Sequence, residues 1–95
     1  MIDDRYNITE EEQVEIVEKY FFDGFLTKFP PKEKQRLVVL REIYKKLNIN
    51  HIYNERELNE TLKSYCDDYV LIRRYLIEYG FLDRKADGSN YWVRK

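Results

Sequence analysis

Apolar residues spaced three and four apart predict a helix near the start of the chain, over residues 9–22. Thr9 and Glu12 have the spacing of a capping box, in which each side chain satisfies a backbone N–H of the other residue. Asp23 and Gly24 then form a turn signal that ends the helix. The apolar stripe of this helix, which we expect to be its buried face, consists of Val14, Val17, Phe21 and Phe25.

From residue 32 to residue 47 the chain contains no glycine or proline, which predicts a second helix. Pro31 fits the first helical position, where its missing N–H costs nothing. Asn48 and Asn50 end this helix, since Asn tolerates the left-handed cap conformation. Residues 51–53 then form a short predicted strand. The apolar side of the helix consists of Leu37, Leu40, Ile43, Tyr44 and Leu47.

Two further helices are predicted next along the chain. The first begins at Asn54, which has the capping-box spacing to Glu57, and it ends just before the Asp67-Asp68 pair. One of these two aspartates caps the second helix. That helix stops at Gly80, the residue type favoured just past a helix end.

Two short runs rich in aromatic and apolar residues, 81–84 and 91–94, predict a β-hairpin, because the residues between them, 86–90, have turn chemistry. From residue 31 the predicted order is therefore helix, short strand, helix, helix, strand, turn, strand. We expect an α+β fold of the winged-helix type: a helix-turn-helix followed by a β-hairpin wing. The N-terminal α-helix is additional to that minimal fold.

The formal net charge of −1 conceals two opposed parts. Residues 1–27 carry 2 basic and 8 acidic side chains, whereas residues 28–95 carry 15 basic and 10 acidic ones. We therefore divide the single domain, residues 1–95, into an acidic N-terminal helix (9–22) and a basic winged-helix body (28–95). Two interpretations of the acidic helix stay open: it packs as an ordinary solvated helix, or it inhibits binding by the basic body.

The chain carries little that could support catalysis. It has one His, one Cys, two Ser and three Gly, and no motif of a nucleophile or of a phosphate loop. His51 and Cys66 could form a nucleophile pair, but a strand-edge His and a small apolar Cys are the simpler interpretation. Two such ligands do not make a zinc site. We expect no enzyme activity, no metal, no cofactor and no small-molecule substrate.

The expected location is the cytoplasm. A single cysteine allows no internal disulfide, and a free thiol fits a reducing compartment. No apolar run approaches the roughly 18 residues that span a bilayer, so no membrane association is expected.

Double-stranded DNA is the first partner that the pattern suggests. Basic side chains occur where a winged helix would present them to phosphates, although each alone is equally an ordinary solvated cation. The candidate nucleic-acid-binding residues are Lys32, Lys34, Arg36, Arg73, Arg74, Arg84, Lys85 and Arg94.

The last predicted helix argues for a different partner. It is apolar nearly all round, which is typical of a helix that is buried on several sides or meets another protein. Asp67 and Asp68 at its start would also repel phosphate. A protein-interaction or homodimerisation surface is therefore the alternative, unless the aromatic residues merely fill a small core. The candidate residues of that surface are Tyr69, Tyr75, Tyr79 and Trp92.

Seven sequence segments, in order, carry a resemblance to a known family. They are FDGFL at 22–26, FP at 29–30, YNERELN at 53–59, DDY at 67–69, LIRRYLI at 71–77, GFLDR at 80–84 and DGSNYW at 87–92. The chain resembles the bacterial domain of unknown function 2087 family (DUF2087), whose members occur alone or attached to helix-turn-helix transcriptional regulators and sometimes to acetyltransferases. The resemblance implies a regulatory, non-catalytic role and supplies no catalytic residues.

Overall fold

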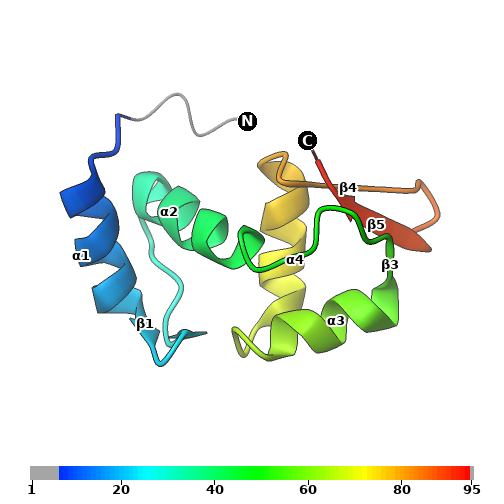
Figure 1. Cartoon of the computed structure of the whole chain (residues 1–95), viewed down its shortest axis with the longest axis horizontal. Helices are drawn as coiled ribbons and strands as arrows, with labels where there is room; N and C mark the ends of the chain where they lie inside the picture. The colour runs from blue at the N-terminus through cyan, green and yellow to red at the C-terminus, as the bar shows by residue number, and fades with distance from the viewer. Residues whose placement is uncertain (1–6, 95) are drawn as a thin grey trace.

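The computed structural model describes residues 7–94, which form an α+β arrangement of four helices and two small antiparallel sheets (Figure 1). Helix α1 lies at one end of the long axis and the last hairpin lies at the other (Figure 1). Helix α2 lies between them and contributes much of the buried core. The helices are α1 (Glu10–Tyr20), α2 (Glu33–Tyr44), α3 (Glu55–Lys63) and α4 (Tyr69–Glu78).

Helix α1 begins as predicted but ends earlier. The Thr9 capping box is present, with the Thr9 hydroxyl accepting from the backbone N–H of Glu12. The helix stops at Tyr20 because the next residues form a hairpin of β1 (Phe21–Phe22) and β2 (Phe25–Leu26). Asp23 and Gly24 close that hairpin with positive φ values of 53° and 78°. Glycine adopts such values readily, and Asp is one of the few other residue types that do.

The predicted buried stripe of this first helix is confirmed only in part: Val17 and Phe21 pack, partly buried, against the core. The fully buried residues of α1 are Ile16 and Tyr20, which the stripe did not include, whereas Val14 is 55% exposed. Phe25 lies beyond the helix, in β2, so it does not extend this helical face. Tyr20 is fixed by its hydroxyl, which donates to Oε1 of Gln35 at 3.1 Å and so joins α1 to α2.

Helix α2 is shorter than predicted at both ends. Its N-cap is Lys32, which is extended, so Pro31 lies outside the helix. The helix ends at Tyr44, and turns carry the chain to the buried Leu47. The predicted apolar side is confirmed in its centre, and Val38 and Val39 are buried as well, so α2 is covered on more than one side.

The caps of α3 and α4 are confirmed. Asn54 and Glu57 form the capping box of α3, and the Asp68 carboxylate accepts from the backbone N–H of Leu71 at the start of α4. The connection between these helices also holds the first hairpin, because the Leu26 N–H donates to the Tyr65 carbonyl at 2.7 Å.

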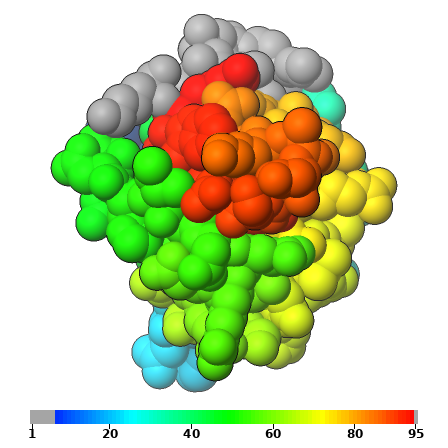
Figure 2. All heavy atoms as spheres, turned by 90° about the vertical axis from the view of Figure 1, so that its right-hand side faces the viewer, coloured from blue at the N-terminus to red at the C-terminus, as the bar shows by residue number. Residues whose placement is uncertain are grey.

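The second sheet consists of β3 (Tyr53–Asn54), β4 (Leu82–Arg84) and β5 (Asn90–Val93), in the order β3-β5-β4 and antiparallel throughout. The predicted hairpin of β4 and β5 is confirmed, and β3 begins two residues later than the predicted strand. Tyr91 and Val93 of β5 are buried against the helices, while Trp92 between them lies on the opposite face. Figure 2 shows this hairpin (orange and red) at the surface, beside the green segment that precedes β3.

Candidate functional site

Two of the basic residues proposed at the start of α2 are occupied inside the fold. The Lys34 ammonium lies 2.5 Å from Oε2 of Glu12, so it joins α2 to the acidic helix α1. The Arg36 guanidinium donates to the Pro30 carbonyl at 2.8 Å and lies over the rings of Phe29 and Tyr75, at 5.3 and 5.4 Å. Such cation–π packing stabilises the fold and leaves Arg36 poorly placed for a phosphate.

The two arginines of α4 have different surroundings. Arg73 is only 17% exposed, and its Nη1 donates to Oδ1 of Asn59 at 2.5 Å and lies 3.4 Å from Oε1 of Glu55. Arg74 is 69% exposed and pairs with Glu78 one turn further on, at 3.3 Å. Of the two, Arg74 alone extends into solvent from α4.

The basic residues of the hairpin are partly engaged with it. Nη1 of Arg84 donates to the carbonyls of Lys85 and Ala86, both at 3.1 Å, and so braces the turn. Nε of Arg94 lies 3.1 Å from Oδ2 of Asp83 on the neighbouring strand. Within residues 7–94, the side chains of Lys32 and Lys85 make no hydrogen bond or ion pair. Figure 1 places the start of α2 beside α1, and the β4–β5 turn at the opposite end of the molecule.

The basic excess of the body lies mainly around α2. Residues 28–53 carry 7 basic and 2 acidic side chains, whereas residues 54–89, which contain α3, α4 and the turn of the hairpin, carry 6 basic and 8 acidic ones. The acidic helix α1 packs against α2, so the opposed charges of the sequence meet at a contact inside the molecule. The elements that a winged helix presents to DNA have no basic excess.

The three tyrosines proposed as an interaction surface, Tyr69 and Tyr75 on α4 and Tyr79 at its C-cap, are partly buried. Tyr75 and Tyr79 stack at 5.9 Å between ring centroids, and Tyr75 also packs at 5.2 Å against Phe29. The Tyr79 hydroxyl donates to Oε2 of Glu33 at 3.0 Å, and burial, together with this bond, raises the pKa of Tyr79. Tyr69 lies beneath the Lys63 ammonium, 5.1 Å from it. These contacts favour a packing role for the three rings.

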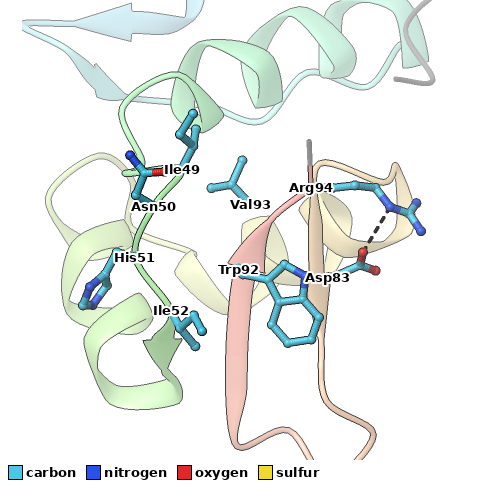
Figure 3. A pocket seen from close by; sticks show the side chains of 8 residues that line it. All are labelled: Ile49, Asn50, His51, Ile52, Asp83, Trp92, Val93 and Arg94. Atoms are coloured by element: carbon cyan, nitrogen blue, oxygen red, sulfur yellow. Dashed lines mark hydrogen bonds and ion pairs between the residues drawn. The ribbon is translucent and has the colours of Figure 1, made fainter.

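Trp92 lies elsewhere, beside a groove on the outer edge of the second sheet (Figure 3). The groove has a volume of about 690 Å³ and runs between β5 and the segment that precedes β3. Ile49 and Ile52 on that segment are 52% and 60% exposed, whereas Val93 is buried. The groove is lined by Ile49, Asn50, His51, Ile52, Asp83, Trp92, Val93 and Arg94.

The groove forms because two strands separate. Tyr53 pairs with Tyr91, but the residues before Tyr53 leave the sheet while β5 continues alongside β4. Trp92 is among the residues predicted for an interaction surface, whereas Ile49 and Ile52 are not. Their signal was two apolar residues in an otherwise polar stretch, NINHI, which follows the predicted second helix and runs into the predicted strand at 51–53.

The charges beside the groove are balanced. Arg94 and Asp83 form an ion pair across β4 and β5, as the dashed line in Figure 3 shows. Nε2 of His51 lies 3.2 Å from Oε2 of Glu57, and the His51 ring packs edge-on against Tyr53 at 4.5 Å. The groove therefore offers apolar surface with one acidic and one basic group on its wall.

The structure does not join His51 to Cys66. The Cys66 thiol is 2% exposed and donates to the Leu62 carbonyl at 3.3 Å, and burial raises its pKa to about 11. His51 lies instead at the groove. Within residues 7–94, no three His, Cys, Asp or Glu side chains are arranged to hold a metal ion. None of the helices described here is long and apolar enough to cross a membrane.

Fold and surface together define a small α+β domain with a groove beside β5. A family model described as "Uncharacterized protein conserved in bacteria (DUF2087)" matches residues 25–93, close to three quarters of the chain. The chain belongs to this family, as the resemblance predicted. Comparison with curated proteins finds no match, and comparison with solved structures finds none either.

Proposed function

We propose that this chain is a non-catalytic, winged-helix-type interaction module that binds protein through the groove beside β5. The observation that carries the proposal is the exposure of Ile49 and Ile52 next to Trp92. Exposed apolar side chains gathered around a hollow mark contact surfaces, and tryptophan is among the residue types that contribute most binding energy there.

The order of the elements supports the winged-helix part of the proposal. From α2 onward the chain runs helix, strand, helix, helix, strand, strand, and β3 joins the hairpin of β4 and β5 as a third strand. The connection between α3 and α4, residues 64–68, is short and close in length to the turn of a helix-turn-helix, which supports the proposal. The resemblance described above implies that members of this family occur alone or attached to helix-turn-helix transcriptional regulators, which supports a module that accompanies a regulator.

The charge distribution favours a protein over DNA as partner. Arg73, Arg36 and Lys34 are held by contacts within the fold, and the helix-turn-helix region has more acidic than basic side chains. The groove, by contrast, combines apolar surface with balanced charge, which is typical of protein contacts.

A displayed library of random peptides tests this proposal. The immobilised full chain is screened alongside Ile52→Glu, which puts a charge into the groove at a position that is already mostly exposed. We expect peptides with apolar or aromatic anchors that bind the wild type, fail on Ile52→Glu and shift the fluorescence of Trp92, the single tryptophan. Val70→Glu is the matched control, because Val70 is also exposed but lies on α4. Equal recovery on wild type and Ile52→Glu would overturn the proposal.

DNA binding is the second candidate, favoured by the exposed Arg74 together with the Lys85 side chain. Mixed-sequence duplex DNA is titrated at low salt with the full chain and with residues 28–95. Phosphate contacts predict an affinity that falls steeply with salt, with a slope of roughly −0.9 for each phosphate neutralised. Salt-steep binding that Arg74→Gln and Lys85→Gln weaken would favour DNA over the groove. Tighter binding by residues 28–95 would show that the acidic helix is inhibitory.

A further inference from the structure

We infer that the partner for which the groove is built is a second copy of this chain, docked groove to groove about a two-fold axis. This inference rests on the proposed function, because it names the occupant of the same groove. In a two-fold contact the same patch meets itself, so the patch must be complementary to itself in shape and in charge. The groove meets both conditions.

The shape condition is met by a projection placed beside a hollow. Ile49 and Ile52 project from the segment before β3, with more than half of each side chain exposed. The hollow lies immediately next to them, between that segment and β5, above the buried Val93 (Figure 3). When two such faces meet about a two-fold axis, the isoleucines of one copy enter the hollow of the other, and the reverse contact follows by symmetry.

The charge condition is met by Asp83 and Arg94. They supply one negative and one positive group to the groove wall. A two-fold contact can therefore place the Arg94 of each copy near the Asp83 of the other, so that the ion pairs extend across the interface. A charge-balanced face attracts its own copy or is indifferent to it, whereas a face of one sign repels itself.

The outer face of α1 shows the contrast. Val14 is as exposed as Ile49, but four exposed carboxylates lie around it against one exposed cation, Lys45, so the excess of negative charge on this face would repel a second copy. These carboxylates are Glu10, Glu11, Glu15 and Glu18. The groove therefore fits a copy of the chain better than this other apolar patch does.

Sedimentation of the full chain over a wide concentration range tests the inference. We expect the wild type to shift from monomer to dimer as concentration rises, with a blue shift of Trp92 emission in parallel. Ile52→Glu is expected to raise the dimer dissociation constant at least about tenfold, as loss of an anchor residue does. Val70→Glu should leave it unchanged, and circular dichroism checks that both variants remain folded.

Charge variants test the two-fold pairing itself. In the Asp83→Arg variant the side chains at positions 83 and 94 are both cations, and in the Arg94→Asp variant both are anions. Two copies of either variant repel each other at the interface, so each variant by itself should stay monomeric. An equimolar mixture should recover a dimer, because the cationic face of one chain then meets the anionic face of the other. Recovery in the mixture cannot come from the ion pair within one chain, since neither chain contains both partners.

Three results would overturn the inference. They are a wild type that stays monomeric at every concentration, a dimer that Ile52→Glu leaves intact, and a mixture of the two charge variants that stays monomeric. A monomeric wild type that still selects groove-binding peptides would refute the second copy and leave the proposed function standing. A chain that neither dimerises nor selects such peptides would refute both.

Discussion

The Arg73 guanidinium donates from Nη1 to Oδ1 of Asn59 at 2.5 Å, and this contact ties α4 to α3. The same nitrogen lies 3.4 Å from Glu55, and the guanidinium lies 5.9 Å from the centre of the Tyr91 ring on β5. Helices α3 and α4 and strand β5 therefore meet at one side chain. Arg73 is among the predicted candidates for contact with DNA phosphates, and the contacts that hold it within the fold favour a structural role.

Replacing Arg73 should therefore affect stability. Arg73→Met keeps much of the apolar stem but leaves Asn59 and Glu55 without their cation, so we expect a loss of about 1.5–3 kcal/mol in the free energy of unfolding. Arg74→Met removes only an exposed pair and should change it by less than about 0.5 kcal/mol. Urea unfolding followed by circular dichroism measures both. Similar losses for the two variants would contradict the structural role of Arg73.

The features predicted correctly are those that depend on residues close together in sequence. The caps at Thr9, Asn54 and Asp68 each need side chains within three positions, and the turn of the last hairpin needs only its own five residues. The first hairpin was missed because Phe21 and Phe25 also fit a helical period.

The candidate site depends on contacts between distant parts of the chain. Ile52 and Trp92 line one groove although 40 positions separate them, because β3 pairs with β5 and the preceding segment then leaves the sheet. The spacing of apolar residues along the chain does not show where a segment leaves a sheet. In the same way, no local pattern showed that Arg73 would meet Asn59 or that Lys34 would meet Glu12.

The Lys34–Glu12 pair should contribute a small, salt-dependent stability. Both side chains are part-exposed, and exposed ion pairs contribute little to stability. A double-mutant cycle with Glu12→Gln and Lys34→Gln should give a small favourable coupling energy at low salt and almost none at high salt. Lys32→Gln is the matched control, since Lys32 has no ion pair within residues 7–94. Coupling that persists at high salt would contradict a screened surface pair.

Glu57 should contribute to the acid sensitivity of the fold. The backbone N–H of Asn54 is the main cause that lowers the pKa of Glu57 below its ordinary value of 4.5, and His51 lowers it further. Because the folded pKa is the lower one, this stabilisation is present above pH 4.5 and is lost as the pH falls below it. Glu57→Gln should flatten the stability profile in that window, measured by thermal melts, while Glu60→Gln should follow the wild type.

Cys66 should react slowly as long as the chain is folded. Burial raises the pKa of its thiol from 9.0 to about 11, which lowers the reactive thiolate fraction about a hundredfold at pH 8. Access is also restricted, because the side chain is almost fully buried. A thiol-specific chromogenic disulfide should therefore react at least about a hundredfold more slowly with the folded chain in buffer than with the unfolded chain in urea.

The same shift predicts a loss of stability in alkali. The unfolded chain loses the thiol proton at a lower pH than the folded chain, so the contribution of Cys66 is intact below pH 9 and is lost as the pH rises towards 11. Cys66→Ala should remove this part of the alkaline decline, measured by urea unfolding at successive pH values from neutral to pH 11. A decline of the same size in Cys66→Ala would assign it to other groups, such as Tyr79, whose pKa is also raised.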